Sequence, residues 1–201
     1  MMNSELKMNN TYIPKQSQNE TEWSGGSTTQ LFIYPEDAIY GQRNFLFRIS
    51  SAKVKDDESV FTKLPGVSRV IMILDGELRI EHEGASAKVL KKFDTNVFQG
   101  DWNTKGFGVC TDFNLMTTGD CSGNLHNVVL NPNQIFTKAF TKNQDFIGYY
   151  LLKGKVEIVF TNNKVELNQN DFILMKRENT TEGFIINANE YAELVEVEIY
   201  L

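Results

Sequence analysis

The chain contains the segment Val70-Ile71-Met72-Ile73-Leu74-Asp75-Gly76-Glu77-Leu78-Arg79-Ile80, which returns 78 residues later as Gly148-Tyr149-Tyr150-Leu151-Leu152-Lys153-Gly154-Lys155-Val156-Glu157-Ile158. Each copy consists of an apolar strand, a glycine turn and an alternating strand. A second matching piece follows each copy, with Leu90 four residues before Asp94 and Leu167 four residues before Asp171. An antiparallel sheet needs this pattern to reverse direction while one face stays dry. The sequence therefore predicts two related β-barrel-like halves.

Length and composition favour an all-β protein in which these halves share one body. At 201 residues the chain can bury a substantial core. Most apolar runs are short, β-branched or aromatic and are bounded by Gly, Asn and Asp, whereas helix signals are nearly absent. We therefore expect two antiparallel β-barrel or jelly-roll halves.

The predicted organisation has four parts. Residues 1–20 are polar and form an N-terminal arm that can add one strand. Residues 21–120 form the first half, and residues 142–201 form the second half. Between them, residues 121–141 are rich in Gly, Asn and Pro and are the predicted linker.

Charge and hydropathy limit the partners and the compartment. The net charge is −6, and Lys and Arg are scattered between acids, which argues against nucleic acid as a partner. No apolar stretch approaches the roughly twenty residues of a membrane span, and the N-terminus has no apolar signal core. We expect a cytoplasmic protein without a membrane partner, in which Cys110 and Cys121 are free thiols rather than a disulfide.

Polar and apolar side chains alternate on three predicted strands of the first half. In the strand from Phe45 to Val54, the arginine and the serines alternate with aromatic residues. The strand from 108 to 116 has the same alternation, and Arg69 lies at the start of a third strand. The polar groups expected on these faces are Arg48, Ser50, Arg69, Asp112 and Asn114.

Two interpretations of these polar faces remain open. In the first, the polar groups are structural: they lie on solvated outer faces or form an internal Arg–Asp pair that holds the sheet together. In the second, they line a cavity. Small neighbours such as Ser50 and Ala52 leave space, and Met116 supplies an adaptable apolar wall. An arginine fork matches a carboxylate through two parallel charge-assisted hydrogen bonds. If Asp112 neutralises one arginine, the other remains available to a ligand.

The repeat resembles that of cupins, and its duplication resembles that of bicupins. Many cupins are metalloenzymes. Their usual ligand set has two histidines two residues apart, a glutamate a few residues later and a third histidine on a later strand. This chain has only His82 after Gly76, while His126 lies in the predicted linker and the second half has no histidine. We therefore expect neither a metal nor another cofactor, and we expect His82, which lies beside a turn, to be solvated or to cap that turn.

Five ordered motifs between about residues 21 and 120 resemble those of the HutD/Ves family. They are Trp23-Ser24-Gly25-Gly26-Ser27-Thr28, Phe47-Arg48-Ile49-Ser50-Ser51-Ala52, Phe61-Thr62 with Leu64-Pro65-Gly66-Val67-Ser68-Arg69, Phe98-Gln99-Gly100-Asp101, and Asp112-Phe113-Asn114-Leu115-Met116. The resemblance implies a bicupin without a known catalytic metal and, in many members, an association with histidine utilisation genes. It also implies that the polar strand positions line a pocket.

The leading hypothesis is a metal-independent binding or regulatory protein for a small anionic metabolite, for which intermediates of histidine breakdown are candidates. Two arginines would clamp a carboxylate, an amide and a hydroxyl would orient it, two aspartates would hold the arginines, and a tryptophan would cover the opening. The predicted ligand-binding residues are Trp23, Thr28, Arg48, Ser50, Arg69, Asp101, Asp112, Asn114 and Met116.

Two other functions are compatible with the sequence. One is an enzyme, either a metal-free isomerase or lyase with an acid such as Asp101, or a cupin oxygenase with atypical ligands. The other is an interaction module without a ligand, in which the polar faces are structural. A homodimer is compatible with the exposed sheet edges of a bicupin.

Overall fold

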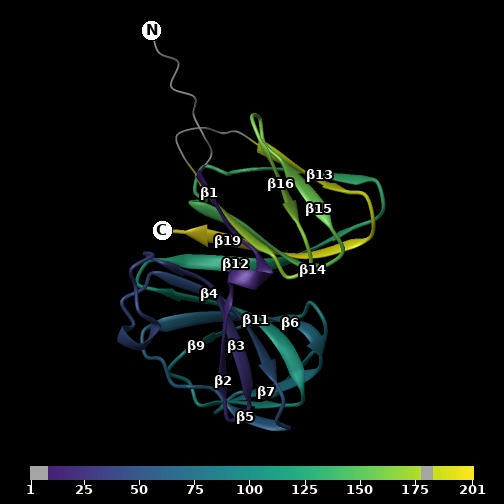
Figure 1. Cartoon of the computed structure of the whole chain (residues 1–201). Helices are drawn as coiled ribbons and strands as arrows, with labels where there is room; N and C mark the ends of the chain where they lie inside the picture. Colours follow the sequence, from purple (N-terminus) through teal and green to yellow (C-terminus); the bar gives the residue numbers. More distant parts are fainter. Residues whose placement is uncertain (1–8, 178–182) are drawn as a thin grey trace. The chain divides into compact units, whose positions relative to one another are not determined.

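The structure is a computed structural model and describes residues 9–177 and 183–201 (Figure 1). Nearly every element in these ranges is a strand, and the helical elements are two short 3-10 turns, η1 (Lys15–Ser17) and η2 (Tyr40–Gln42). The prediction of an all-β fold is confirmed. None of the helices in the described ranges is long and apolar enough to cross a membrane.

The chain divides into two compact units, of which the N-terminal unit is Gln18–Leu125. It contains a six-stranded sheet with the order β2-β3-β4-β11-β6-β9 and a four-stranded sheet with the order β5-β10-β7-β8. The bounds of these strands are β2 Asn19–Trp23, β3 Gly26–Tyr34, β4 Phe47–Val54, β5 Glu58–Val60, β6 Val67–Gly76, β7 Leu78–His82, β8 Lys88–Leu90, β9 Thr95–Gln99, β10 Thr104–Phe107 and β11 Cys110–Thr118.

The C-terminal unit comprises the described residues of Met1–Ser17 and of His126–Tyr200. Its sheets have the orders β1-β17-β14-β19-β12 and β13-β18-β15-β16. The strands are β1 Asn9–Ile13, β12 Ser122–Leu130, β13 Gln134–Ala139, β14 Phe146–Lys153, β15 Val156–Val159, β16 Lys164–Leu167, β17 Phe172–Lys176, β18 Gly183–Ala188 and β19 Ala192–Tyr200. β1 pairs antiparallel with β17, so the N-terminal arm adds a strand to this unit.

Residues 121–141, for which the sequence predicts a linker, contain the whole of β12 and of β13. Val128 and Leu130 are buried, and they alternate with exposed neighbours as a half-buried strand requires. The Asn131-Pro132-Asn133 segment is a turn between the two strands, with Asn133 at a φ of 64°. The turn residues suggested an unstructured connection, but they mark a short reversal between strands.

The two copies of the repeat make the same glycine turn. Gly76 has a φ of +76° and Gly154 has a φ of +87°, and residues other than glycine rarely adopt this backbone conformation. A Cβ atom would lie 2.4 Å from the Val109 carbonyl oxygen at the first turn and 2.3 Å from the Tyr191 carbonyl oxygen at the second. Both turns therefore require glycine for conformation and for space.

The Leu-x-x-x-Asp pieces also form the same turn twice. The Asp94 carboxylate accepts a hydrogen bond from the Lys91 backbone N–H at 2.9 Å. The Asp171 carboxylate accepts one from the Asn168 backbone N–H at 2.8 Å. In each copy the aspartate side chain closes a turn of four residues, which explains why the residue recurs.

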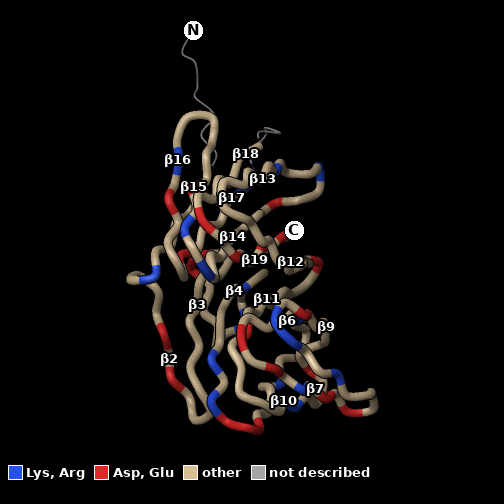
Figure 2. Tube along the Cα trace, turned by 90° about the vertical axis from the view of Figure 1, so that its right-hand side faces the viewer, with Lys and Arg blue, Asp and Glu red and all other residues tan. Residues whose placement is uncertain are grey.

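Charged side chains of both signs are interspersed along the chain (Figure 2). Exposed ion pairs join neighbouring strands, as Lys105 on β10 does with Glu58 on β5 at 2.8 Å. Cys110 and Cys121 are both buried and are not joined by a disulfide.

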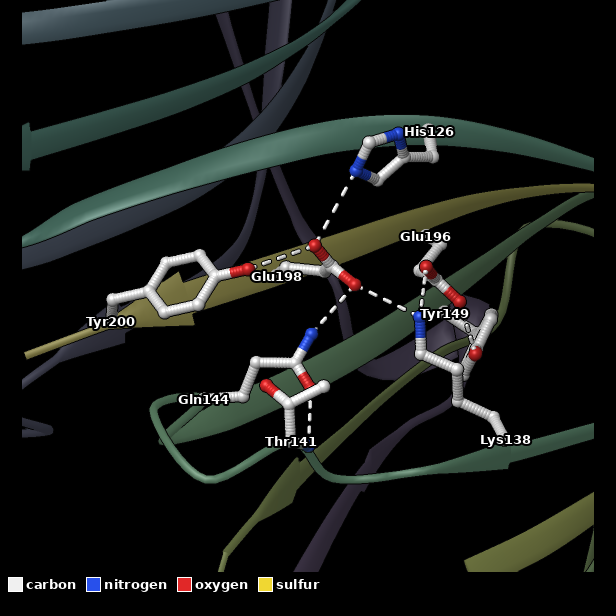
Figure 3. Close-up of polar contacts among 8 residues, drawn as sticks. All are labelled: His126, Lys138, Thr141, Gln144, Tyr149, Glu196, Glu198 and Tyr200. Atoms are coloured by element: carbon white, nitrogen blue, oxygen red, sulfur yellow. Dashed lines mark hydrogen bonds and ion pairs between the residues drawn. The ribbon is translucent and has the colours of Figure 1, made fainter.

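The C-terminal unit contains a buried network of charged and polar side chains among its apolar residues. Lys138 Nζ donates hydrogen bonds to Glu196 at 2.7 Å and to Glu198 at 2.9 Å, and both carboxylates are buried. The Tyr149 hydroxyl donates to Glu196, and Gln144 donates to Glu198 at 2.6 Å. Figure 3 shows Glu198 at the centre, where Tyr200 and His126 contact its second oxygen. Burial is the largest single influence on Glu198 and opposes its ionisation, but the hydrogen bond and charge of Lys138, the Tyr200 hydrogen bond and His126 together outweigh it and lower the pKa of this carboxyl.

Replacement of Lys138 should destabilise the protein strongly. We expect Lys138→Met to lower the free energy of unfolding by about 3 kcal/mol, because it leaves two buried carboxylates without their cation. The measurement is urea unfolding at neutral pH. Adding Glu196→Gln and Glu198→Gln to the same chain should recover more than half of the loss, since the buried charges are then gone.

Lys105→Met is the matched control, because it removes a lysine from an exposed ion pair. It should cost no more than about 0.5 kcal/mol. Equal losses in Lys138→Met and Lys105→Met would show that the buried network contributes nothing particular to stability.

Candidate functional site

A cavity of about 530 Å³ lies in the N-terminal unit, bounded by β3, β4, β6, β11 and the segment 59–62. Eight of the nine predicted ligand-binding residues line it: Trp23, Thr28, Arg48, Ser50, Arg69, Asp112, Asn114 and Met116. Asp101 does not, because it lies on an exposed turn after β9. The hypothesis that Asp101 holds the arginines therefore has no support in this geometry.

Strand parity brings the polar groups of β4 and β11 to the same place. In the antiparallel register, Arg48 faces Met116 and Ser50 faces Asn114. Ile49 and Phe113 alternate with them, are fully buried and do not line the cavity. Adjacent strands thus present their polar positions to one side, as the period of two requires.

Arg48 is buried, with 7% of the residue exposed, and three neighbours hold it in one orientation. Its Nε donates to Gln30 Oε1 at 2.8 Å, and its Nη1 donates to Ser50 Oγ at 3.1 Å. The guanidinium carbon lies 4.2 Å from the centroid of the Tyr40 ring. Burial lowers the pKa of Arg48, but a guanidinium remains protonated at neutral pH. The side chain is therefore a fixed cation whose two hydrogen-bond acceptors and stacked ring are all uncharged.

Arg69 is buried beside two aromatic rings. Its guanidinium carbon lies 5.0 Å from the ring centroids of both Phe61 and Phe98, and 6% of the residue is exposed. Burial lowers the pKa of Arg69, and the nearby Asp112 carboxylate opposes that effect. The aromatic faces attract the cation but do not supply a hydrogen-bond acceptor, and the buried Nε has no partner.

Three buried polar atoms of the cavity have no hydrogen-bond partner. They are Arg69 Nε, Asp112 Oδ1 and Asn114 Oδ1, and no other buried side-chain nitrogen or oxygen in residues 9–177 and 183–201 lacks a partner. A buried polar atom that loses its partner costs about 1–3 kcal/mol. Unpaired atoms gathered on one cavity wall indicate a place that a ligand or water completes.

The charge of the cavity is unbalanced. Among its lining residues, the ionic side chains are Arg48, Arg69 and Asp112. Burial raises the pKa of Asp112 to about 6, even though Arg69 acts in the opposite direction. Two cations therefore face at most one carboxylate, which leaves the cavity with a net positive charge near neutral pH.

Trp23 lies at the exposed side of the cavity, with 41% of its surface accessible. Its indole N–H donates to Thr28 Oγ1 at 3.2 Å, which joins the end of β2 to β3. Both side chains were predicted for the site. Trp23 and Thr28 are placed to contact the part of a ligand at the opening of the cavity rather than its buried charged group.

The sequence prediction missed three residues that shape the site: Gln30, Tyr40 and Phe61. Gln30 follows Thr28 on the same face of β3, so strand parity could have identified it. Tyr40 belongs to the short turn η2, and no local pattern signals its stacking on Arg48. Phe61 belongs to one of the five family-like motifs, but its contact with Arg69 depends on how the chain folds between β5 and β6.

His82 was expected to be solvated or to cap a turn, and this prediction is wrong. The imidazole is buried, with Nε2 2.8 Å from the Asn96 amide nitrogen and Nδ1 2.8 Å from Thr104 Oγ1. Burial lowers its pKa, and Lys88 adds to this effect. His126 lies on β12, 3.4 Å from Glu198. Within the described ranges, no three His, Cys, Asp or Glu side chains gather in a group that could hold a metal ion.

The repeat allows the two units to be compared position by position. On β11, Asn114 is paired with Ile71 and Met116 with Arg69. Seventy-eight residues after Ile71 and Arg69 are Tyr149 and Ile147, which are paired with Glu196 and Glu198. The C-terminal unit thus has two glutamates where the N-terminal unit has Asn114 and Met116, and an isoleucine where it has Arg69.

Comparisons with known proteins agree with this architecture. The chain is similar to the conserved protein of unknown function PA5104 from Pseudomonas aeruginosa PAO1, with 19% identity, a TM-score of 0.83 and coverage of 96% of this chain and 100% of that chain. It is similar to HutD from Pseudomonas fluorescens SBW25, with 18% identity, a TM-score of 0.71 and coverage of 94% and 98%. It is also similar to the Lactobacillus farciminis oxalate decarboxylase formate complex, with 8% identity, a TM-score of 0.71 and coverage of 96% and 86%. No curated protein matched the sequence.

These structural likenesses confirm the predicted bicupin fold. The HutD family model matches residues 15–192, which include nearly all of both units. The chain belongs to the HutD family.

Proposed function

We propose that the N-terminal unit binds a small anionic metabolite, and that Arg48 and Arg69 hold its carboxylate. The observation that carries this proposal is the gathering of two buried guanidinium groups and three unpaired polar atoms in one cavity. An anion would balance the excess positive charge and accept a hydrogen bond from Arg69 Nε, which is the one donor among the unpaired atoms. The two unpaired oxygens need donor groups, which a protonated part of the ligand or water can supply. The arginines provide the charge that a metal ion provides in other cupins.

The volume of the cavity and the geometry of its arginines favour a small carboxylate. A volume of about 530 Å³ lies within the range of small-molecule sites. The planar fork of arginine matches two carboxylate oxygens, and the aromatic rings beside both arginines fix the plane of each fork. Two structural neighbours are associated with formate: the P. fluorescens HutD structure is of a formate condition, and the L. farciminis oxalate decarboxylase structure is of a formate complex.

Membership of the HutD family supports a role linked to histidine utilisation. In this role the chain binds an intermediate of histidine breakdown in the cytoplasm and reports its level rather than converting it. The fixed orientation of Arg48 suits binding, because little order has to be created when the ligand arrives.

A second function, catalysis on a small carboxylate, is favoured by one observation. Asp112 is a buried carboxyl group with a pKa of about 6 in the wall of the cavity, which suits a general acid or base near neutral pH. This assigns to Asp112 the role that the sequence suggested for Asp101. Turnover of a carboxylate substrate that is lost in Asp112→Asn would favour this function over binding alone.

Replacement of Arg48 should remove most of the affinity for small carboxylates. We expect Arg48→Met to weaken the binding of formate and oxalate by about 30-fold, or about 2 kcal/mol, since the ligand loses a buried charge-assisted contact. Arg48→Lys should fall between this variant and the wild type, because lysine keeps the charge but not the fork. The measurement is the shift in melting temperature against ligand concentration.

The control variant is Arg79→Met, because Arg79 is exposed, pairs with Glu81 and does not line the cavity. It should respond to both carboxylates as the wild type does. Undiminished stabilisation of Arg48→Met by formate and oxalate would exclude Arg48 as the clamp.

Trp23 should report the ligand directly. The chain has two tryptophans, and only Trp23 lines the cavity, whereas Trp102 packs edge-on against His82. We expect oxalate to change the intrinsic fluorescence of the wild type and of Trp102→Phe, but not that of Trp23→Phe. A signal that disappears in Trp102→Phe and persists in Trp23→Phe would place the ligand elsewhere.

A further inference from the structure

Asp112 is the acidic member of the cavity, and its surroundings do not suit a permanent negative charge. Only 3% of the residue is exposed, and its register partners, Ile73 on β6 and Ala52 on β4, carry no charge. One carboxyl oxygen, Oδ1, has no hydrogen-bond partner. An ionised carboxylate accepts hydrogen bonds but cannot donate one, so this oxygen stays unsatisfied while the group is charged.

The groups that face Asp112 set its ionisation. Arg69 on β6 attracts the charged form, and Arg48 on β4 adds a second cation to the same cavity. The other titratable groups nearby are the Tyr40 hydroxyl on the cavity wall and the Cys110 thiol on the same strand, and burial and Asp112 raise the pKa of that thiol to about 12. Burial outweighs the cations and raises the pKa of Asp112 to about 6.

An anion in the cavity would change this balance in one direction. A ligand carboxylate between the arginines adds a negative charge near Asp112 and offsets the attraction of Arg69. Both effects favour the protonated form of Asp112. A protonated carboxyl can also donate its O–H to an oxygen of the ligand, whereas two facing carboxylates repel each other. The proton comes from solvent and stays on the Asp112 carboxyl while the ligand is bound.

We propose that Asp112 is the proton acceptor of the cavity, so that the N-terminal unit binds its anionic ligand together with one proton. The inference rests on the proposed function and adds its regulation, because ligand and proton then strengthen each other's binding by the same factor. The occupied fraction would fall as the pH rises above neutral, even at constant ligand concentration.

The test is calorimetric titration of the wild-type protein with formate, which does not itself titrate above about pH 5. Titrations at about pH 7.5 in two buffers of different ionisation enthalpy give the number of protons taken up. We expect uptake approaching one proton per formate. We also expect the affinity to fall by up to about tenfold per pH unit between about pH 6.5 and pH 8.

Two variants assign the proton to Asp112. Asp112→Asn should bind formate without proton uptake, with an affinity that no longer depends on pH and exceeds that of the wild type at about pH 8. Asp101→Asn is the matched control, because Asp101 is an exposed aspartate of the same unit outside the cavity. It should keep the wild-type pH profile.

The outcomes separate this inference from the proposed function. Formate binding by the wild type that is independent of pH and takes up no proton would overturn the proton coupling and leave the anion site intact. A wild-type pH slope that persists in Asp112→Asn would overturn the assignment to this residue. If neither formate nor oxalate binds at any pH, the proposed function fails, and the coupling fails with it. The wild-type proton count needs no variant, so the test does not depend on the folding of Asp112→Asn.

Discussion

The N-terminal unit has to keep two guanidinium groups out of water with only one carboxylate near them. Burial of an unpaired charge costs several kcal/mol, so such groups persist only where other contacts offset the loss of solvent. Arg48 has two neutral hydrogen-bond acceptors and the face of Tyr40, and Arg69 has the faces of Phe61 and Phe98. These contacts orient the cations without neutralising them. The positive charge of the cavity is therefore a consequence of how the arginines are supported.

The same scaffold carries the opposite arrangement in the C-terminal unit. Both units use the glycine turn and the aspartate turn of the repeat, and both pair the repeat strand with a strand that bears polar groups at the same register. In the C-terminal unit, the buried carboxylates of Glu196 and Glu198 receive their cation from Lys138 of the same unit. The N-terminal unit provides no such internal counterion for its second arginine. Charge balance, rather than topology, therefore distinguishes the internally neutralised network of the C-terminal unit from the cavity with excess positive charge in the N-terminal unit.

Strand parity and turn chemistry are local properties, and they explain how much the sequence could predict. The alternation in Phe47-Arg48-Ile49-Ser50 depends only on the period of an extended chain, so the sequence predicted that the polar residues share one face. That this face lines the cavity follows only from the folded structure. Asp101 and His82 could not be placed in this way, because contacts between distant segments leave one on the surface and bury the other. The strands within 121–141 were hidden by turn residues that also suit a linker. Tyr40 has no periodic context at all, and only the folded structure brings its ring to Arg48.

The unpaired atoms of the cavity link stability to function. At about 1–3 kcal/mol each, Arg69 Nε, Asp112 Oδ1 and Asn114 Oδ1 together represent a large part of the 5–15 kcal/mol that stabilises a typical domain. An apolar residue at the aspartate position would remove part of this cost, and the repeat has such a residue in Leu194, which occupies the equivalent register position. The N-terminal unit instead retains polar groups whose full hydrogen bonding requires a further molecule. Unsatisfied polar atoms of this kind are expected at ligand-binding sites, because a ligand that supplies the missing hydrogen bonds binds more tightly by the free energy of those bonds.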